Sequence, residues 1–241
     1  MDIWAYLHQF LFGFYPYIAL TVFFVGSLLR FDREQYSWRA DSSQLLRKKQ
    51  LRWGSNLFHF GVLVVFTGHL VGFLMPEPIV LAFMNEHAHE LLAMVGGGVA
   101  GVAAIIGLSI LIHRRLTEPR LRSNSRPWDL LIVAILWIQL ALGLATVYFS
   151  SVKVEGYSFQ ALIYYVQGIV IFRPNNADLL LTIPWVYKLH IFLGLTIFLV
   201  FPFTRLVHIW SGFASVFYLF RPFQLMRTRR TRQARGVQGI K

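Results

Sequence analysis

The chain of 241 residues contains no cysteine. This absence excludes disulfide bonds, iron–sulfur clusters held by thiolates and haem attached through thioether bonds, so any metal would be held by nitrogen or oxygen ligands. Acidic residues are also scarce: 11 Asp and Glu against 23 Lys and Arg give a net charge of +12. A basic chain can bind nucleic acid, but these basic residues flank long apolar runs, as membrane topology requires. We therefore expect the protein to lie in a lipid bilayer and to bind no nucleic acid.

Apolar residues make up 56% of the chain, and its mean hydropathy is +0.54. Several runs reach the roughly 18 to 20 apolar residues that cross a bilayer. The sequence therefore predicts an all-α integral membrane protein, a five-helix transmembrane bundle over residues 1–225 followed by a basic tail over residues 226–241. The N-terminus lacks the basic start of a secretory signal, so we expect it to be retained. The predicted spans are Gly13–Phe31, Ser55–Met75, Leu91–Ile112, Trp128–Phe149 and Val186–Trp210.

The loops between these spans differ sharply in positive charge. Arg and Lys are abundant in the first loop, the third loop and the tail, whereas the second loop, residues 76–90, has none and the fourth, residues 150–185, has only Lys153 and Arg173. Loops rich in Lys and Arg stay on the cytoplasmic side. We therefore expect a multi-pass protein of the inner (cytoplasmic) membrane, with its N-terminus outside and its C-terminus in the cytoplasm.

Two further segments fall outside the spans. The apolar stretch Ala161–Phe172 is too short to cross a bilayer, so we expect it at the outer interface or packed on the mouth of the bundle. The basic tail can lie on anionic lipid or dock a cytoplasmic partner, and composition does not choose between the two.

Four histidines lie inside the apolar spans, where a polar, titratable ring is energetically expensive and therefore points to a function. His59 and His69 belong to the second span, and His190 and His208 to the fifth. Because these spans run in opposite directions, depth pairs His69 with His190 on the outer side and His59 with His208 on the inner side. Two such pairs supply the nitrogens for two b-type haems, each with its iron between two imidazoles.

Small residues and one cation fit this interpretation. Glycine gives a macrocycle room against a helix backbone, and the candidates are Gly61, Gly68, Gly72 and Gly194. Arg205, three residues before His208, can neutralise the propionates of the inner haem.

The helical spacing of the two pairs does not match. Ten residues separate the histidines of the second span and eighteen those of the fifth, which correspond to about 15 Å and about 27 Å along straight helices. We expect Pro202 to bend the fifth helix between its two histidines.

Two other interpretations of the histidines stay open at this point. They can be packing residues, hydrogen-bonded across the bundle. They can also relay protons, but such a relay would want acidic partners at depth, and Gln139 is the only other strongly polar side chain near the centre of a span. The glycines at residues 96–98 allow close helix packing or room for a ligand.

Three stretches of the chain closely resemble the gamma subunit of respiratory nitrate reductase, a membrane cytochrome b. They are YPYIALTVFFVGSLLRFDREQYSWRADSSQLL, SNLFHFGVLVVFTGHLVGFL and KLHIFLGLTIFLVFPFTRLVHIW. The resemblance extends over residues 14–223 and keeps both histidine spacings. It implies two haem b groups on the histidine pairs named above, with quinol as substrate near the outer haem. It also implies that electrons pass to an iron–sulfur beta subunit and then to a molybdenum alpha subunit on the cytoplasmic side.

The resemblance also implies a quinol pocket around Gly68 and His69. A lysine of the family at the start of the third span is replaced here by His89, which could bind a quinone oxygen and accept its proton. Nearby Glu86, His87 and Glu90 are alternative bases, and the two histidines could also be solvated residues at a loop end.

We therefore predict a quinol-oxidising electron-transfer subunit, with nitrate itself reduced on another subunit. The alternatives are the cytochrome b subunit of a sulfur or heterodisulfide-type complex and, from a different class, a haem-free membrane transporter or assembly protein. His8 and His113 are expected to be interfacial residues without function.

Overall fold

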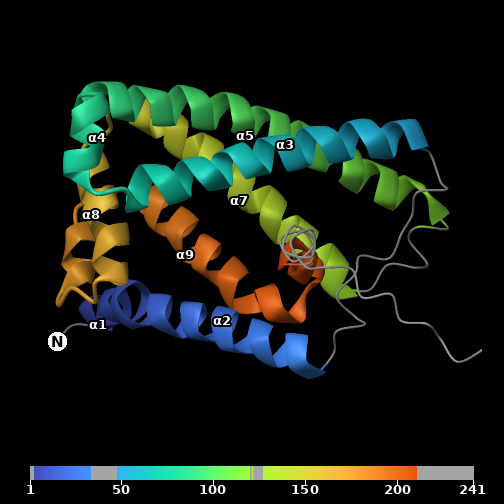
Figure 1. Ribbon diagram of the computed structural model, residues 1–241, viewed down its shortest axis with the longest axis horizontal. Helices are drawn as coiled ribbons and strands as arrows, with labels where there is room; N and C mark the ends of the chain where they lie inside the picture. Colours follow the sequence, from blue (N-terminus) through green and yellow to red (C-terminus); the bar gives the residue numbers. More distant parts are fainter. Residues whose placement is uncertain (1–2, 34–47, 120, 122–126, 211–241) are drawn as a thin grey trace, which may run out of the picture. The chain divides into compact units, whose positions relative to one another are not determined.

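The computed structural model describes residues 3–33, 48–119, 121 and 127–210, and its described regular structure is helical. The chain divides into two compact units, Met1–Val207 and His208–Lys241. The first unit contains every helix discussed below (Figure 1).

Among the described residues, five helices are long and apolar enough to cross a membrane, which confirms the predicted number of spans. The first crossing combines α1 (Ile3–Gln9), the single π-helical turn η1 (Phe10–Phe14) and α2 (Tyr15–Arg33). The others are α3 (Lys48–Leu74), α5 (Glu86–Thr117), α7 (Pro127–Ser151) and α9 (Trp185–Val200). A helix satisfies its own backbone groups, which is why spans in lipid take this form.

The fifth crossing ends earlier than the predicted Trp210. Helix α9 stops at Val200 and gives way to the 3-10 turns η4 (Phe201–Phe203) and η5 (Arg205–Val207). The prediction was a bend at Pro202, but the α-helix instead ends two residues before it, because proline cannot donate a backbone hydrogen bond. The Arg30 guanidinium of α2 donates hydrogen bonds to the carbonyl oxygens of Pro202 and Thr204, at 2.5 and 3.1 Å. The break is therefore stabilised from the neighbouring helix.

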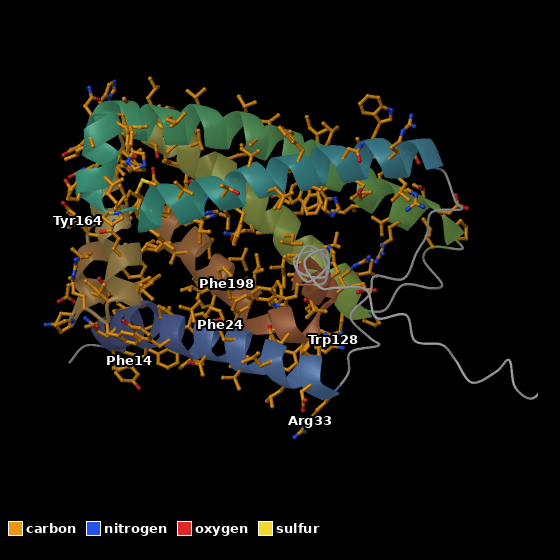
Figure 2. All side chains as sticks on the ribbon, in the orientation of Figure 1. Phe14, Phe24, Arg33, Trp128, Tyr164 and Phe198 are labelled. Carbon is orange, nitrogen blue, oxygen red and sulfur yellow. The ribbon has the colours of Figure 1, made fainter. Side chains whose placement is uncertain are left out.

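Helix contacts run in the order α3, α5, α7, α9, α2. Helices α3 and α5 pack closely together, and a Cβ added at Gly61 would lie 2.5 Å from the Ala100 carbonyl oxygen. Aromatic packing joins α2 to α9, and the Phe23 ring meets the Phe198 ring edge-on at 5.1 Å. Figure 2 shows Phe24 and Phe198 between these two helices, with Arg33 and Trp128 at one end of the bundle and Phe14 and Tyr164 at the other.

A short helical cap covers the end of the bundle near Tyr164. It consists of α4 (Glu77–Phe83), α8 (Phe159–Val170) and η3 (Asn176–Leu180), and α4 and α8 lie at the same end in Figure 1. The fully buried Tyr165 of α8 donates a hydrogen bond to the Phe12 carbonyl oxygen at 2.9 Å. The predicted short apolar segment therefore packs on the bundle mouth, where its residues join a buried cluster. This cluster comprises Phe12, Leu162, Tyr165, Ala177, Leu180, Ile183 and Tyr187.

Candidate functional site

The ring of His69 on α3 is held by its own helix. Its Nδ1 lies 2.8 Å from the carbonyl oxygen of Val65, four residues earlier. A carbonyl can only accept, so Nδ1 carries the ring hydrogen and Nε2 keeps its lone pair. In metal-binding histidines, one imidazole nitrogen usually donates its hydrogen to a backbone carbonyl oxygen, and the lone pair of the other nitrogen binds the metal.

The ring of His190 on α9 lies close to that of His69. The two ring centroids are 6.2 Å apart and the planes are inclined by 45°. A metal ion bound to both rings at the usual metal–nitrogen distance of about 2.0–2.1 Å would place two ring centroids about 6 Å apart, once the ring radii are added. The structure therefore brings the predicted outer pair together at a separation that fits a shared metal ion.

The surroundings of His190 leave polar atoms unsatisfied. The Gln139 amide of α7 donates to the His190 carbonyl oxygen at 3.1 Å, and its nitrogen lies 3.4 Å from the ring Nε2. His190 Nδ1 and Gln139 Oε1 are both buried, and neither has a hydrogen-bond partner in the part of the chain that the structure describes. Such atoms destabilise a structure by about 1–3 kcal/mol each unless a ligand or water reaches them. The site therefore fits a group that binds nitrogen at this depth.

The glycines beside the pair have different roles. A Cβ added at Gly68 would meet no atom of the described residues within 4 Å, so the backbone next to His69 is open to a flat ligand. A Cβ at Gly194 would lie 3.1 Å from the Gln139 amide nitrogen, which places this glycine beside the same site. Gly72 is in ordinary contact range of His89, at 3.5 Å from Nε2 to the added Cβ.

The interpretation of Gly61 as room for a macrocycle is wrong. A Cβ there would meet Ala100 and Ala104 of α5 at 2.5–2.9 Å, so this glycine permits the close packing of α3 on α5. Gly96 and Gly97, by contrast, have no protein atom within 4 Å of an added Cβ, and helix packing does not explain them.

The predicted inner pair is described only in part. The His59 Nδ1 lies 2.7 Å from the Ser55 carbonyl oxygen, so the ring has the same tautomer as His69, with Nε2 as the nitrogen that bears a lone pair. His208 begins the second compact unit, so its pairing with His59 stays a prediction. Arg205 of η5 lies close enough to Arg115 of α5 for their charges to interact. Arg115 belongs to the basic loop predicted between the third and fourth spans, and the sequence does not show that it lies near Arg205.

The predicted quinol residues lie near the outer pair. The Phe73 ring is 5.4 Å from the His69 ring, and the Phe159 ring is 6.2 Å from Phe73 and 5.2 Å from His89, each measured between centroids. These aromatic rings connect His69 to His89 across α3, α8 and α5. The sequence showed Phe73 and Phe159 only as apolar residues, because their contacts join distant parts of the chain.

A small pocket adjoins His89. It has a volume of about 10 Å³, enough for about one water molecule. Tyr164 donates a hydrogen bond to the Glu77 carboxylate at 2.8 Å, and Gln167 to the Met75 carbonyl oxygen at 3.1 Å. These bonds hold α8 against α4 and against the residue that follows α3, beside the pocket, so a quinol ring would enter only if this cap shifted. The pocket is lined by Gly72, Met75, Glu77, Val80, Leu81, Glu86, His89, Gln160 and Ile163.

His8 and His113, the two histidines that we expected to be interfacial, both have local contacts. His8 Nε2 lies 2.9 Å from the Ala177 carbonyl oxygen and ties α1 to η3. His113 lines an open groove of about 450 Å³ between α5 and α7, next to Trp137, whose indole donates to the Ser109 hydroxyl at 3.0 Å.

Comparison with known protein families gives a match over residues 8–229 to the nitrate reductase gamma subunit. The chain is 47% identical over 225 residues to the respiratory nitrate reductase 2 gamma chain of Escherichia coli, which covers 93% of this chain and 99% of that one. It is 39% identical to the nitrate reductase gamma chain of Bacillus subtilis, over 92% and 98% of the two chains. A weaker similarity, 29% over 171 residues, covers 67% of this chain and 46% of the Hdr-like menaquinol oxidoreductase cytochrome b-like subunit of Archaeoglobus profundus.

Proposed function

The chain belongs to the nitrate reductase gamma subunit family, and from this membership we propose that its bundle binds two b haems that carry electrons from quinol to a cytoplasmic partner. It is the quinol-oxidising membrane cytochrome b subunit of a respiratory nitrate reductase complex. The haem number, the ligands and the direction of electron flow are the proposed parts.

The observation that carries the proposal is the approach of His69 to His190. Their centroid separation of 6.2 Å fits two imidazoles on one iron, and the His69 tautomer presents Nε2. We assign this pair to the outer haem. His59, whose tautomer is the same, would hold the inner haem together with His208, and Arg205 would stand near its propionates.

When bound, the haems would supply the one-electron chemistry. The protein's own residues do the remaining work. Gln139 holds α7 against the backbone of His190 and so fixes the position of this ligand. Gly68, His69 and His89 would border the quinol ring, and His89 would accept a hydrogen bond or a proton from its hydroxyl.

The direction of transfer rests on the charges of the loops. Arg33 lies at the opposite end of the bundle from Tyr164 (Figure 2), and its neighbouring loop is rich in Arg and Lys. The positive-inside rule places that end in the cytoplasm. Quinol would then be oxidised at the end that carries the α4–α8 cap, and electrons would move inward to an iron–sulfur beta subunit and a molybdenum alpha subunit.

Single substitutions of the four histidines test the ligand assignment. We expect His69→Ala and His190→Ala each to remove the same haem, and His59→Ala and His208→Ala each to remove the other. Haem content by pyridine haemochrome, together with low-spin signals in electron paramagnetic resonance, identifies which haem is lost. His8→Ala and His113→Ala are matched controls that should keep both haems. Loss of one and the same haem in His59→Ala and His69→Ala would refute the assignment by depth.

A second candidate is the cytochrome b subunit of another quinol-linked complex, which the archaeal similarity favours. The nitrate reductase similarity is higher and covers nearly the whole chain. Purification of the native complex separates the two: a molybdenum-containing partner supports the first, and a heterodisulfide-type partner without molybdenum supports the second.

A further inference from the structure

A carboxylate is buried at the capped end of the bundle. Glu90, in the second turn of α5, has only 9% of its surface exposed, and its Oε1 has no hydrogen-bond partner among the described residues. Burial of a carboxylate is unfavourable unless it is paired, hydrogen-bonded or protonated. One of the two carboxylate oxygens of Glu90 therefore lacks the hydrogen-bond partner that a buried charge normally has.

The other carboxylate oxygen of Glu90 lies near an exposed lysine. Its Oε2 lies 3.7 Å from Lys153 Nζ, and the Lys153 side chain is 65% exposed. Because this lysine is mostly exposed, the ion pair contributes little to stability. The pair does connect a buried acid directly to a solvated ammonium group in the loop after α7.

Hydroxyl groups extend this polar cluster toward the outer histidine pair. Burial raises the pKa of the Tyr157 phenol, and the nearby Glu90 carboxylate raises it further. The Tyr157 ring stacks on the Tyr187 ring at 5.5 Å, and the Tyr187 hydroxyl lies 2.9 Å from the buried Ser150 hydroxyl. Tyr187 precedes His190 by three residues, which places it one turn from that histidine on the same side of α9.

Glu90 is also close to the quinol pocket. Glu86 and His89 line this pocket. Glu86 precedes Glu90 by four residues on α5, so the two carboxylates share one helix face. Glu90 therefore follows directly on α5 the residues that line this pocket, and its carboxylate contacts a lysine that is exposed to water.

Quinol oxidation needs such a group, because each quinol loses two electrons and two protons. We propose that Glu90 is the proton relay of quinol oxidation in this chain. The two quinol O–H bonds break one after the other, each as an O–H bond forms on the carboxylate, while the two electrons would leave one at a time for the haem that His69 and His190 would hold. The Glu90 O–H bond then breaks and the proton passes to water beside Lys153, which restores the carboxylate. This inference rests on the proposed function and names a residue that it leaves unassigned.

Other titratable groups surround Glu90 and bear on its pH dependence. They are Lys153 and Tyr157 from the loop after α7, Tyr187 from α9, and Glu86 and His87 from α5 itself. The carboxylate must be ionised to accept a proton, so quinol oxidation should slow as falling pH protonates it.

The test uses the intact complex with Glu90→Gln and, as a matched control, Glu155→Gln, which changes an exposed glutamate in the same loop as Lys153. Stopped-flow reduction of the haems by a menaquinol analogue is followed over a range of pH. Glu90→Gln should reduce the rate about tenfold or more and remove the acid limb of the profile, and Glu90→Asp should restore part of both. Haem content and nitrate reduction driven by a reduced viologen should not change.

Equal rates and equal pH profiles in Glu90→Gln, Glu155→Gln and the unaltered complex would overturn the relay. If Glu90→Gln loses haem, Glu90→Asp decides: a slower rate with a displaced acid limb supports the relay, and an unchanged rate and profile overturn it. Failure of the unaltered complex to take electrons from quinol would instead refute the proposed function, so the two failures are distinguishable.

Discussion

Two glycines of α3, Gly61 and Gly68, should respond differently to substitution by alanine. In Gly61→Ala, the new methyl group would lie 2.5 Å from the Ala100 carbonyl oxygen and 2.6 Å from the Ala104 nitrogen. Neither backbone atom can move without displacing α5. In Gly68→Ala, the new methyl group would meet no protein atom within 4 Å. The first substitution therefore strains the packing of α3 on α5, and the second does not.

The magnitude follows from the difference between the two variants. Alanine favours a helix over glycine by up to about 1 kcal/mol, and this gain cancels in the comparison because both glycines lie inside the same helix. The overpacking at residue 61 should destabilise the protein by about 1–3 kcal/mol. For a chain of this size, each kcal/mol corresponds to about 2–4 °C in Tm. Gly61→Ala should therefore melt about 2–12 °C below Gly68→Ala.

The assay is thermal unfolding of both variants in the same detergent, together with a haem spectrum of each. Gly61→Ala should show a lower Tm with both haem bands kept as long as it is folded. Gly68→Ala should keep its Tm and alter the outer haem or the rate of its reduction by quinol, because its backbone borders the proposed site. Equal Tm values would refute the packing argument, and an unaltered outer haem and quinol rate in Gly68→Ala would remove the role given to this glycine.

Three further predictions concern single side chains. Arg30→Met should lower Tm, because the carbonyl oxygens of Pro202 and Thr204 lose a charged donor, with a loss of about 1.5–3 kcal/mol for each bond to the guanidinium; Arg30→Lys should fall in between, and a Tm equal to that of the unaltered protein would contradict the stabilisation of the helix break. Tyr165→Phe should destabilise the cap by about 1–3 kcal/mol, since the buried carbonyl oxygen that accepts its hydrogen bond would lose its donor; thermal unfolding measures this, and no change in Tm would show that the bond is unimportant. His89→Ala should slow quinol oxidation without removing haem, and stopped-flow kinetics that match those of the unaltered complex would exclude a role for His89.

The sequence was sufficient to predict the number of spans and the partner of His69. Hydropathy determines the spans because lipid demands long apolar helices, and the opposite directions of α3 and α9 bring residues of equal depth together. The position of the helix break was also predictable, because Pro202 removes a backbone donor whatever surrounds it. The role of Arg30, which stabilises this break, could not be predicted from the sequence, since its contact joins residues 172 positions apart.

The sequence did not distinguish the roles of the glycines. Gly61 and Gly68 lie seven residues apart, close to two helical turns, yet one packs on α5 and the other borders open space. Which neighbour a glycine faces depends on the tilt and the path of another helix, and neither can be derived from one chain. The contact of Gln139 with His190 and the burial of Glu90 beside Lys153 also depend on the path of neighbouring helices, so the sequence did not predict them.

Optical spectroscopy of the purified chain decides whether it is a cytochrome b that quinol reduces. We expect reduced b-type haem bands equivalent to about two haems per chain, of which the outer is the first to be reduced when a menaquinol analogue is added. A correctly folded, membrane-derived protein without haem, or one whose haems quinol does not reduce, would refute this function.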